Sequence, residues 1–323
     1  MQYTQLGRSG VRVSKLCLGT MNLGKLVDEP TSHTILDTAL EKGIVFIDTA
    51  DVYGGVGNRG RTEEIIGRWF AQGNGRRERI VLATKVYGKM GEGQNDRGLS
   101  AVHIRRACEE SLRRLRTDHI DLYQMHHIDH NAPWEEIWQA MEQLIQAGKV
   151  TYLGSSNFAA WNIVDAQYAA RARKLFGLIS EQSLYNLSNR WVELEVIPAC
   201  RALGIGLIPW SPLAEGLLAG ILQYEGGIRR KKETVLNRLV KYRQQVEQFE
   251  SFCAQIEMKP EAVALAWLLN NPIVTSVIIG PRTIEQLIGL IEGIEIKLSR
   301  EQLSELDRIW PGPGGEAPEA YSW

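Results

Sequence analysis

The sequence alternates eight times between a short apolar, β-branched run and a longer stretch with apolar residues at helical spacing. The runs cover residues 16–18, 45–47, 80–84, 120–125, 150–153, 177–180, 205–209 and 274–279. The helical stretches cover 31–42, 63–70, 100–115, 134–147, 159–172, 191–203, segments within 236–270, and 283–291. Eight strand–helix units predict an α/β fold, a single (β/α)₈ or TIM barrel. A doubly wound sheet needs fewer strands and usually divides into two halves.

Three segments fall outside these units. A hairpin is expected over 3–13, turning at Arg8-Ser9-Gly10, and we expect it to cover the bottom of the barrel. A long loop over 220–237 follows strand seven, and a Pro- and Gly-rich tail begins at Trp310. The 323 residues contain no linker and no shift in composition, so one domain spanning 1–323 is expected.

Composition excludes several classes of partner. The formal net charge is −1, which gives no broad positive field for nucleic acid or anionic membrane, and the basic cluster at 229–232 is interpreted as a solvated loop. The four cysteines are far apart, so neither a disulfide framework nor a Cys-rich zinc site is expected. The N-terminal residues lack the apolar core of a signal peptide, which predicts a cytoplasmic protein.

The segment from Asp48 to Gly60 supports two competing interpretations. Residues 55–60 match G-x-G-x-x-G, the pattern of a dinucleotide-binding turn. Such a turn needs its glycines directly after a strand, yet Gly55 comes seven residues after Asp48, and the next strand ends at Lys85 rather than at an acid. The alternative is that Asp48 and Tyr53 belong to a proton-transfer site and that the glycines form a loop.

The ends of the predicted strands favour the proton-transfer site. Strand two ends at Asp48 with Tyr53 in the following loop, strand three ends at Lys85, and strand four ends at His126. Active sites of (β/α)₈ barrels form at the carboxyl ends of the strands. Each residue alone has a structural explanation, as a cap, a surface pair or a core histidine. Together they place a carboxylate, an ammonium, an imidazole and a phenol at one rim.

With these motifs, the chain resembles the aldo-keto reductases along nearly its whole length. The resemblance rests on Phe46-Ile47-Asp48-Thr49-Ala50-x-x-Tyr53-Gly54, Thr84-Lys85, Asp121-Leu122-Tyr123-Gln124-x-His126, Gly154-x-Ser156-Asn157-Phe158, Gln182-x-x-Tyr185-Asn186, Pro209-Trp210-Ser211-Pro212-Leu213 and Gly280-x-Arg282-x-x-x-Gln286. It implies hydride transfer from NAD(P)H to a carbonyl carbon. Tyr53 would supply the proton, Lys85 would lower the tyrosine pKa, Asp48 would hold Lys85, and His126 would orient the carbonyl.

The resemblance also implies cofactor contacts. Ser156, Asn157 and Gln182 would bind the carboxamide, Trp210 would stack on the nicotinamide, and Arg282 would pair with a 2′-phosphate, which favours NADPH. The full set of expected cofactor residues is Gly19, Thr20, Met21, Asp48, Ser156, Asn157, Gln182, Trp210, Ser211, Pro212, Leu213, Gly216, Leu217, Gly280, Arg282 and Gln286. Two departures from the family pattern, Leu290 and Gly220-Ile221-Leu222, put an adenine contact and the cofactor clasp in doubt.

The expected substrate is a small carbonyl compound, with pocket walls from Met21, Tyr53, His126 and His127 and no metal. A metal site at His126-His127-x-Asp129-His130 would need ligands too close in sequence. Segments 57–64, 126–129, 133–138 and 154–158 resemble the branch that reduces nucleotide-linked keto-deoxysugars. Two alternatives stay open: a broad-specificity aldehyde or ketone reductase, and a regulatory cofactor-binding subunit like the potassium-channel beta subunits.

Overall fold

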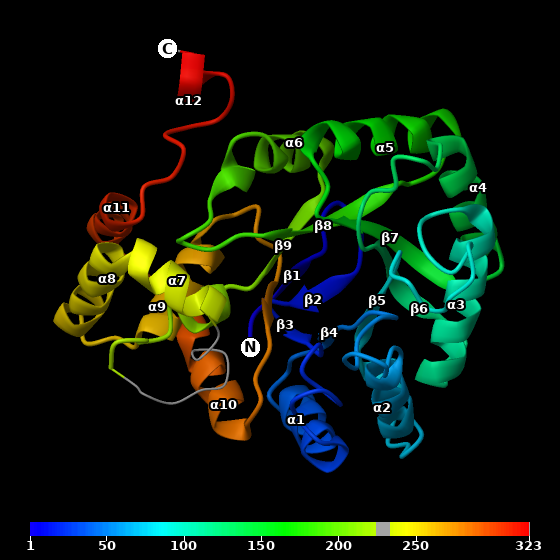
Figure 1. Ribbon diagram of the computed structural model, residues 1–323, viewed down its shortest axis with the longest axis horizontal. Helices are drawn as coiled ribbons and strands as arrows, with labels where there is room; N and C mark the ends of the chain where they lie inside the picture. The colour runs from blue at the N-terminus through cyan, green and yellow to red at the C-terminus, as the bar shows by residue number, and fades with distance from the viewer. Residues whose placement is uncertain (224–232, 323) are drawn as a thin grey trace.

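Eight parallel strands form one sheet in the computed structural model, which describes residues 1–223 and 233–322. The strands follow the order β10-β3-β4-β5-β6-β7-β8-β9, and helices surround them (Figure 1). Their bounds are β3 (Leu16–Gly19), β4 (Phe46–Asp48), β5 (Val81–Val86), β6 (Ile120–Met125), β7 (Val150–Ser156), β8 (Leu178–Leu184), β9 (Gly206–Trp210) and β10 (Val277–Ile279). The predicted (β/α)₈ barrel is confirmed.

The barrel closes through a divided last strand. The expected run at 274–279 is one segment in sequence, but only Val277–Ile279 pairs with β3. The residues just before it bond to β9 instead: Leu207 N donates to Ile273 O over 3.1 Å, and Thr275 N donates to Leu207 O over 2.8 Å. The segment first bonds to β9 and then pairs with β3, which closes the barrel. The regular strand β10 is therefore shorter than the expected run.

The helices begin where capping side chains are available. Asp28, Ser100, Thr283 and Ser299 each accept a hydrogen bond from a backbone N–H in the first turn of a helix. The helices are α1 (Glu29–Glu41), α2 (Arg61–Phe70), α3 (Ala101–Leu115), α4 (Trp134–Gln146), α5 (Ala160–Ala172), α6 (Val196–Leu203), α7 (Glu233–Lys241), α8 (Arg243–Gln255), α9 (Pro260–Asn270), α10 (Ile284–Glu292), α11 (Arg300–Ile309) and α12 (Glu319–Ser322). Within the described ranges, none combines the length and apolar character needed to cross a membrane.

Three expectations about these elements need correction. The helix expected over 191–203 is a short 3₁₀ turn, Trp191–Glu193, followed by α6, because a continuous helix would press the Pro198 ring against the carbonyl of residue 194. The expected loop over 220–237 already turns into α7 at Glu233, and the cluster 229–232 lies outside the described residues. Helix α11 was not expected, although Ser299 and Gln302 form a capping box, which is a sequence signal for the start of a helix.

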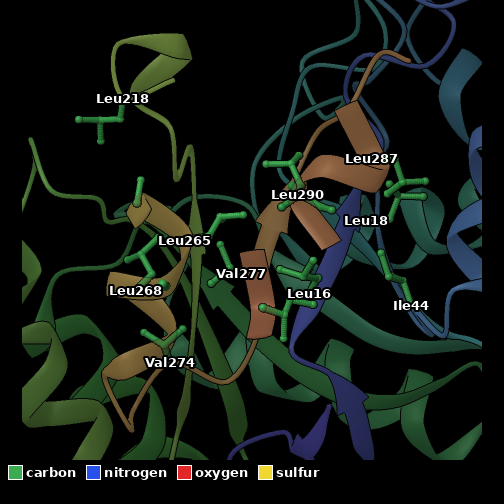
Figure 2. Packing of buried hydrophobic residues seen from close by; sticks show 14 of the residues in the cluster. Leu16, Leu18, Ile44, Leu218, Leu265, Leu268, Val274, Val277, Leu287 and Leu290 are labelled. Carbon is green, nitrogen blue, oxygen red and sulfur yellow. The ribbon is translucent and has the colours of Figure 1, made fainter. Parts of the chain in front are cut away.

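The core forms between the barrel and its helices. Figure 2 shows Leu16 and Leu18 of β3, Val277 of β10, and leucines of α9 and α10 packed together in this layer. Leu290 of α10 is one of them and is only 8% exposed. Its side chain therefore contributes to the core, which agrees with its departure from the polar residue of the family pattern.

The N-terminal hairpin seals the lower end of the barrel, as expected. Strands β1 (Tyr3–Gln5) and β2 (Arg12–Ser14) pair antiparallel, and Leu6 is fully buried among the residues that fill the barrel interior. Arg8 N donates to Gly204 O over 2.8 Å, just before β9 begins. Gly7 has a positive φ of 56°, and a Cβ atom there would collide with the carbonyl oxygen of Ile179 at the start of β8.

We therefore predict that Gly7→Ala lowers the free energy of unfolding by more than about 2 kcal/mol, because it adds both backbone strain and a collision with backbone. Gly10 is the matched control, since it lies in the same turn and an added Cβ atom meets nothing within 4 Å. Gly10→Ala should change the free energy by less than about 0.5 kcal/mol in urea denaturation. Equal losses in the two variants would contradict the close packing at Gly7.

Candidate active site

Polar side chains from four strands meet at the carboxyl end of the barrel. Asp48 is the last residue of β4, Lys85 lies in β5, Gln124 in β6 and Gln182 in β8. All four side chains are at least 96% buried, in a barrel whose lower interior is apolar. The structure thus brings Asp48 and Lys85 together as expected, and adds Gln124 to them.

The centre of this group is a buried ion pair. Lys85 Nζ donates to Asp48 Oδ2 over 2.6 Å and to the carbonyl oxygen of Thr49 over 2.8 Å. Burial acts to lower the pKa of Lys85, but the negative charge of Asp48 and the hydrogen bonds to Asp48 and Tyr53 outweigh it, and the net shift is upward. Lys85 is therefore a charged ammonium at neutral pH.

Two glutamines hold the other carboxylate oxygen. Gln124 Nε2 donates to Asp48 Oδ1 over 2.9 Å, and Gln182 Nε2 donates to the same atom over 2.8 Å. Gln182 Nε2 also reaches Gln124 Oε1 over 3.2 Å. Gln124 received no role from sequence reasoning. The available signal was a polar residue at the end of an apolar strand, on the same face as Leu122, which fills the barrel interior.

A register shift decides which residue of β8 enters the barrel. Ile179 belongs to the interior cluster, so simple alternation would direct Glu181 inward. The pairing of β7 with β8 shifts between Leu153 and Gly154, after which Gln182 lies opposite Ser156. Gln182 therefore points into the barrel and Glu181 points out, since a one-residue shift exchanges the two faces of a strand.

Tyr53 lies over the ion pair. Lys85 Nζ donates to its hydroxyl oxygen over 3.4 Å and lies 5.0 Å from the ring centroid. We expected Lys85 to bring the tyrosine pKa down. Burial instead raises the pKa of Tyr53, and the Lys85 cation offsets only part of that rise. The phenol is therefore protonated at neutral pH.

His126 follows β6 directly and meets Tyr53 edge-on, with ring centroids 6.0 Å apart. His127 stacks on it at 5.2 Å and also contacts Tyr87 at 5.4 Å. Burial, followed by repulsion from Lys85, lowers the pKa of His126 to about 2. The imidazole is therefore neutral, with one ring nitrogen able to donate and the other able to accept.

The turn after β7 connects three parts of the rim. Asn157 adopts a left-handed φ of 59°, and its Oδ1 accepts a hydrogen bond from Trp210 Nε1 over 3.0 Å. Its Nδ2 donates to the carbonyl oxygen of His126 over 3.3 Å. Ser156 Oγ donates to the carbonyl oxygen of Gln182 over 2.9 Å. The expected carboxamide-binding residues are thus neighbours in space, next to the end of β9.

The segment after β9 winds tightly. Ser211 and Gly216 have positive φ angles of 56° and 107°, and Asn186 Nδ2 donates to the carbonyl oxygen of Ser211 over 2.9 Å. Leu217 is fully buried in the core. Leu217 can therefore offer a ligand only its backbone. Pro212 and Leu213, the remaining expected cofactor residues of this segment, lie between Ser211 and Gly216.

The segment after β10 leads into the N-terminus of α10. Arg282 N donates to Gln286 Oε1 over 2.9 Å, which fixes the bend before the helix. The Arg282 side chain is half-buried and, in the described part of the chain, has no acidic partner. Gly280 O accepts a hydrogen bond from Asn22 Nδ2 over 2.9 Å. A partly enclosed cation beside a helix N-terminus suits an anion.

The segment after β3 completes the rim. Thr20 N and Oγ1 both donate to the carbonyl oxygen of Asp48, over 3.0 Å and 2.9 Å. Gly19 ends β3, and Met21, two residues further on, is 43% exposed. Met21 is thus accessible to a ligand.

The glycine pattern at 55–60 lies in the loop between β4 and α2. Gly55, Gly57 and Gly60 all have positive φ angles, and Gly60 caps α2 without a side-chain bond. The sheet around them is a closed barrel rather than a doubly wound sheet. The loop interpretation is confirmed, and the dinucleotide turn is excluded by the fold.

Known proteins match the chain over most of its length. The model of the aldo/keto reductase family matches residues 15–311. "Uncharacterized oxidoreductase YrpG" of Bacillus subtilis (strain 168) is 55% identical, with 100% of each chain covered. Versiconal hemiacetal acetate reductase of Aspergillus parasiticus is 33% identical, covering 95% of this chain and 96% of its own. The probable voltage-gated potassium channel subunit beta of Oryza sativa subsp. japonica is 34% identical, covering 92% of each.

The buried ion pair generates a prediction about stability. Asp48→Asn leaves the Lys85 ammonium buried without its counter-charge, and we expect it to lower the free energy of unfolding by about 3–5 kcal/mol. The double variant Asp48→Asn/Lys85→Met removes both charges, so it should lose clearly less than the sum of the two single variants. Chemical denaturation measures all three. Additive losses would contradict a direct interaction between the two side chains.

Proposed function

The chain belongs to the aldo/keto reductase family, and on that premise we propose that it reduces a carbonyl substrate to an alcohol with NADPH, with Tyr53 as proton donor. The observation that carries the proposal is the Tyr53 hydroxyl placed 3.4 Å from a fully buried ammonium. A protonated phenol next to a fixed cation is suited to giving its proton to an oxygen that gains negative charge.

The residues at the rim fit a nicotinamide dinucleotide phosphate. Trp210 ends β9 beside Asn157, which offers an aromatic face next to amide groups. The Arg282 guanidinium is half-buried and forms no ion pair with an acid in residues 1–223 or 233–322, so it matches a phosphate. When bound, NADPH supplies the hydride. We propose that Ser156, Asn157 and Gln182 hold the carboxamide and that the segments after β3, β9 and β10 hold the remainder.

The proton transfer follows from the electrostatics. As the carbonyl oxygen becomes an alkoxide, Tyr53 gives up its proton, and the phenolate that remains is stabilised by the Lys85 ammonium. Asp48 keeps that ammonium in place and charged. The neutral His126 imidazole donates a hydrogen bond to the substrate oxygen and orients it, without adding a second positive charge.

For the substrate we propose a nucleotide-linked keto-deoxysugar, supported by the motifs that the chain shares with that branch of the family. The proposed pocket walls are Met21, Tyr53, His126 and His127.

The second candidate, a broad-specificity aldehyde or ketone reductase, is supported by the relative named as a versiconal hemiacetal acetate reductase. The relative named as a potassium channel subunit supports a regulatory subunit as the third candidate. We also propose a cytoplasmic location.

The test is NADPH oxidation, followed by absorbance, on a panel of simple aromatic aldehydes and a nucleotide-linked 4-keto-6-deoxysugar. We predict that Tyr53→Phe lowers kcat by at least about 100-fold, because the proton donor is lost, and changes the Kd of NADPH by less than about two-fold. Loss of NADPH binding in this variant would contradict the role of Tyr53.

The substrate panel separates the candidate functions. Turnover only on the nucleotide sugar supports deoxysugar reduction, and comparable turnover on the aldehydes supports the broad reductase. No turnover on either favours the regulatory subunit.

The 2′-phosphate contact is tested separately. Arg282→Ala should weaken NADPH binding by about 10- to 100-fold, since it removes hydrogen bonds to a charged group, and should leave NADH binding nearly unchanged. Fluorescence titration gives both Kd values. Arg308→Ala serves as control, because Arg308 is exposed and pairs with Glu305 on α11. Equal losses for the two cofactors would exclude a 2′-phosphate contact.

A further inference from the structure

Glu181 is a buried acid that takes no part in the chemistry above. It lies in β8 next to Gln182 and is fully buried. Because Gln182 points into the barrel, Glu181 points to the other face of the sheet, opposite Ser155 of β7. A buried carboxyl group is costly unless its oxygens find hydrogen-bond donors. Its partners therefore indicate what it does.

The Glu181 carboxyl group bonds on both sides of the turn after β7. Its Oε2 accepts from Ser155 Oγ over 2.5 Å, just before the turn. Its Oε1 accepts from the backbone N–H of Phe158 over 3.2 Å, just after the turn, and from Ser183 Oγ over 2.7 Å. Within the described residues Glu181 forms no ion pair, so serine hydroxyls and the backbone amides of Asn157 and Phe158 are its support.

The turn that Glu181 spans consists of Ser156 and Asn157. Asn157 holds a left-handed backbone conformation that costs free energy in a non-glycine residue. Its side chain reaches Trp210 on one side and the His126 carbonyl on the other. A small change in this turn would therefore move the amide group proposed to bind the cofactor and the indole proposed to stack on it.

We propose that Glu181 is a positioning residue, which in its ionised form clamps the Ser156–Asn157 turn in the cofactor-binding shape and on taking up a proton loosens it. The inference rests on the proposed function, because it assigns a control to the same cofactor site. It names a residue that touches neither substrate nor cofactor and acts through the turn.

The protonation of Glu181 falls in the neutral range. Burial raises its pKa to about 7, although the hydrogen bonds from Ser155 and Ser183 favour the charged form. Above that pH the carboxylate accepts all of these hydrogen bonds with full charge. Below it, the acid needs an acceptor for its own proton, and Ser155 Oγ can provide one by donating instead to the carbonyl oxygen of Ser180, 3.4 Å away.

The groups around Glu181 do not titrate in the same range. On the helix side, an ionisable neighbour is Cys200 of α6, and burial raises the pKa of its thiol, which stays neutral. On the barrel side, His126 is neutral because burial lowers its pKa to about 2. We therefore expect Glu181 to be the group in this cluster that takes up a proton near pH 7.

The experiment measures the Kd of NADPH between about pH 6 and pH 8 for the wild-type protein and for Glu181→Gln. Glutamine has the shape of the protonated acid and is always neutral. We expect wild-type affinity to weaken about five-fold as pH falls through 7, because neutral hydrogen bonds replace charge-assisted ones. Glu181→Gln should show the weaker affinity throughout, so the two curves meet at low pH.

Two controls separate this effect from others. The 2′-phosphate of NADPH titrates near a pKa of about 6, and His127 lies at the pocket, but both contribute equally to the two proteins and cancel in their ratio. Asp121→Asn alters an acid that holds the Leu82 N–H over 2.8 Å at the opposite end of the barrel. That variant should keep the wild-type pH profile even where its stability is lower.

Three outcomes are distinguishable. Convergence of the two curves at low pH, with separation at high pH, supports the clamp. A constant ratio of the two Kd values across the range overturns it and leaves the proposed function intact. Failure of the wild-type protein to bind NADPH or NADH at any pH overturns the proposed function, and the clamp with it.

Discussion

The arrangement of the candidate site depends on one buried interaction, the ion pair between Asp48 and Lys85. Charges removed from water lose several kcal/mol of hydration each, and mutual attraction alone rarely restores it. Here the remaining hydrogen-bonding capacity is filled by Thr49, Gln124 and Gln182. The same contacts tie β4, β5, β6 and β8 together at one end of the barrel. Site and scaffold are therefore stabilised by a single network.

The Lys85 charge acts differently on its two titratable neighbours. It opposes the rise that burial causes in the Tyr53 pKa, and it adds to the fall that burial causes in the His126 pKa. Burial is the larger influence in both cases, so both groups are neutral at neutral pH. A neutral phenol and a neutral imidazole next to one fixed cation leave room for a single new negative charge, and that charge is the one a carbonyl oxygen acquires on reduction.

Much of the barrel could be predicted from sequence, since eight apolar runs and the residues at their ends need only the period of each element. What could not be predicted depends on geometry between elements. The shift at Leu153 and Gly154 decides that Gln182 faces inward and Glu181 outward. The direction of the Tyr53 pKa shift depends on the depth of burial, which no spacing reveals. By contrast, the break of the helix before Pro198 and the start of α11 at Ser299 could have been predicted from the sequence.

The seal at the lower end has a consequence for how the chain is made. The hairpin strands lie between Tyr3 and Ser14, yet Arg8 bonds to the carbonyl oxygen of Leu203, 195 residues away. During synthesis the apolar side of the hairpin emerges long before β8 and β9, which it must contact. Contacts so distant in sequence form slowly, and exposed apolar surface invites aggregation in the meantime. A segment that leaves the ribosome well before β8 and β9 is thus among the last to reach its final neighbours.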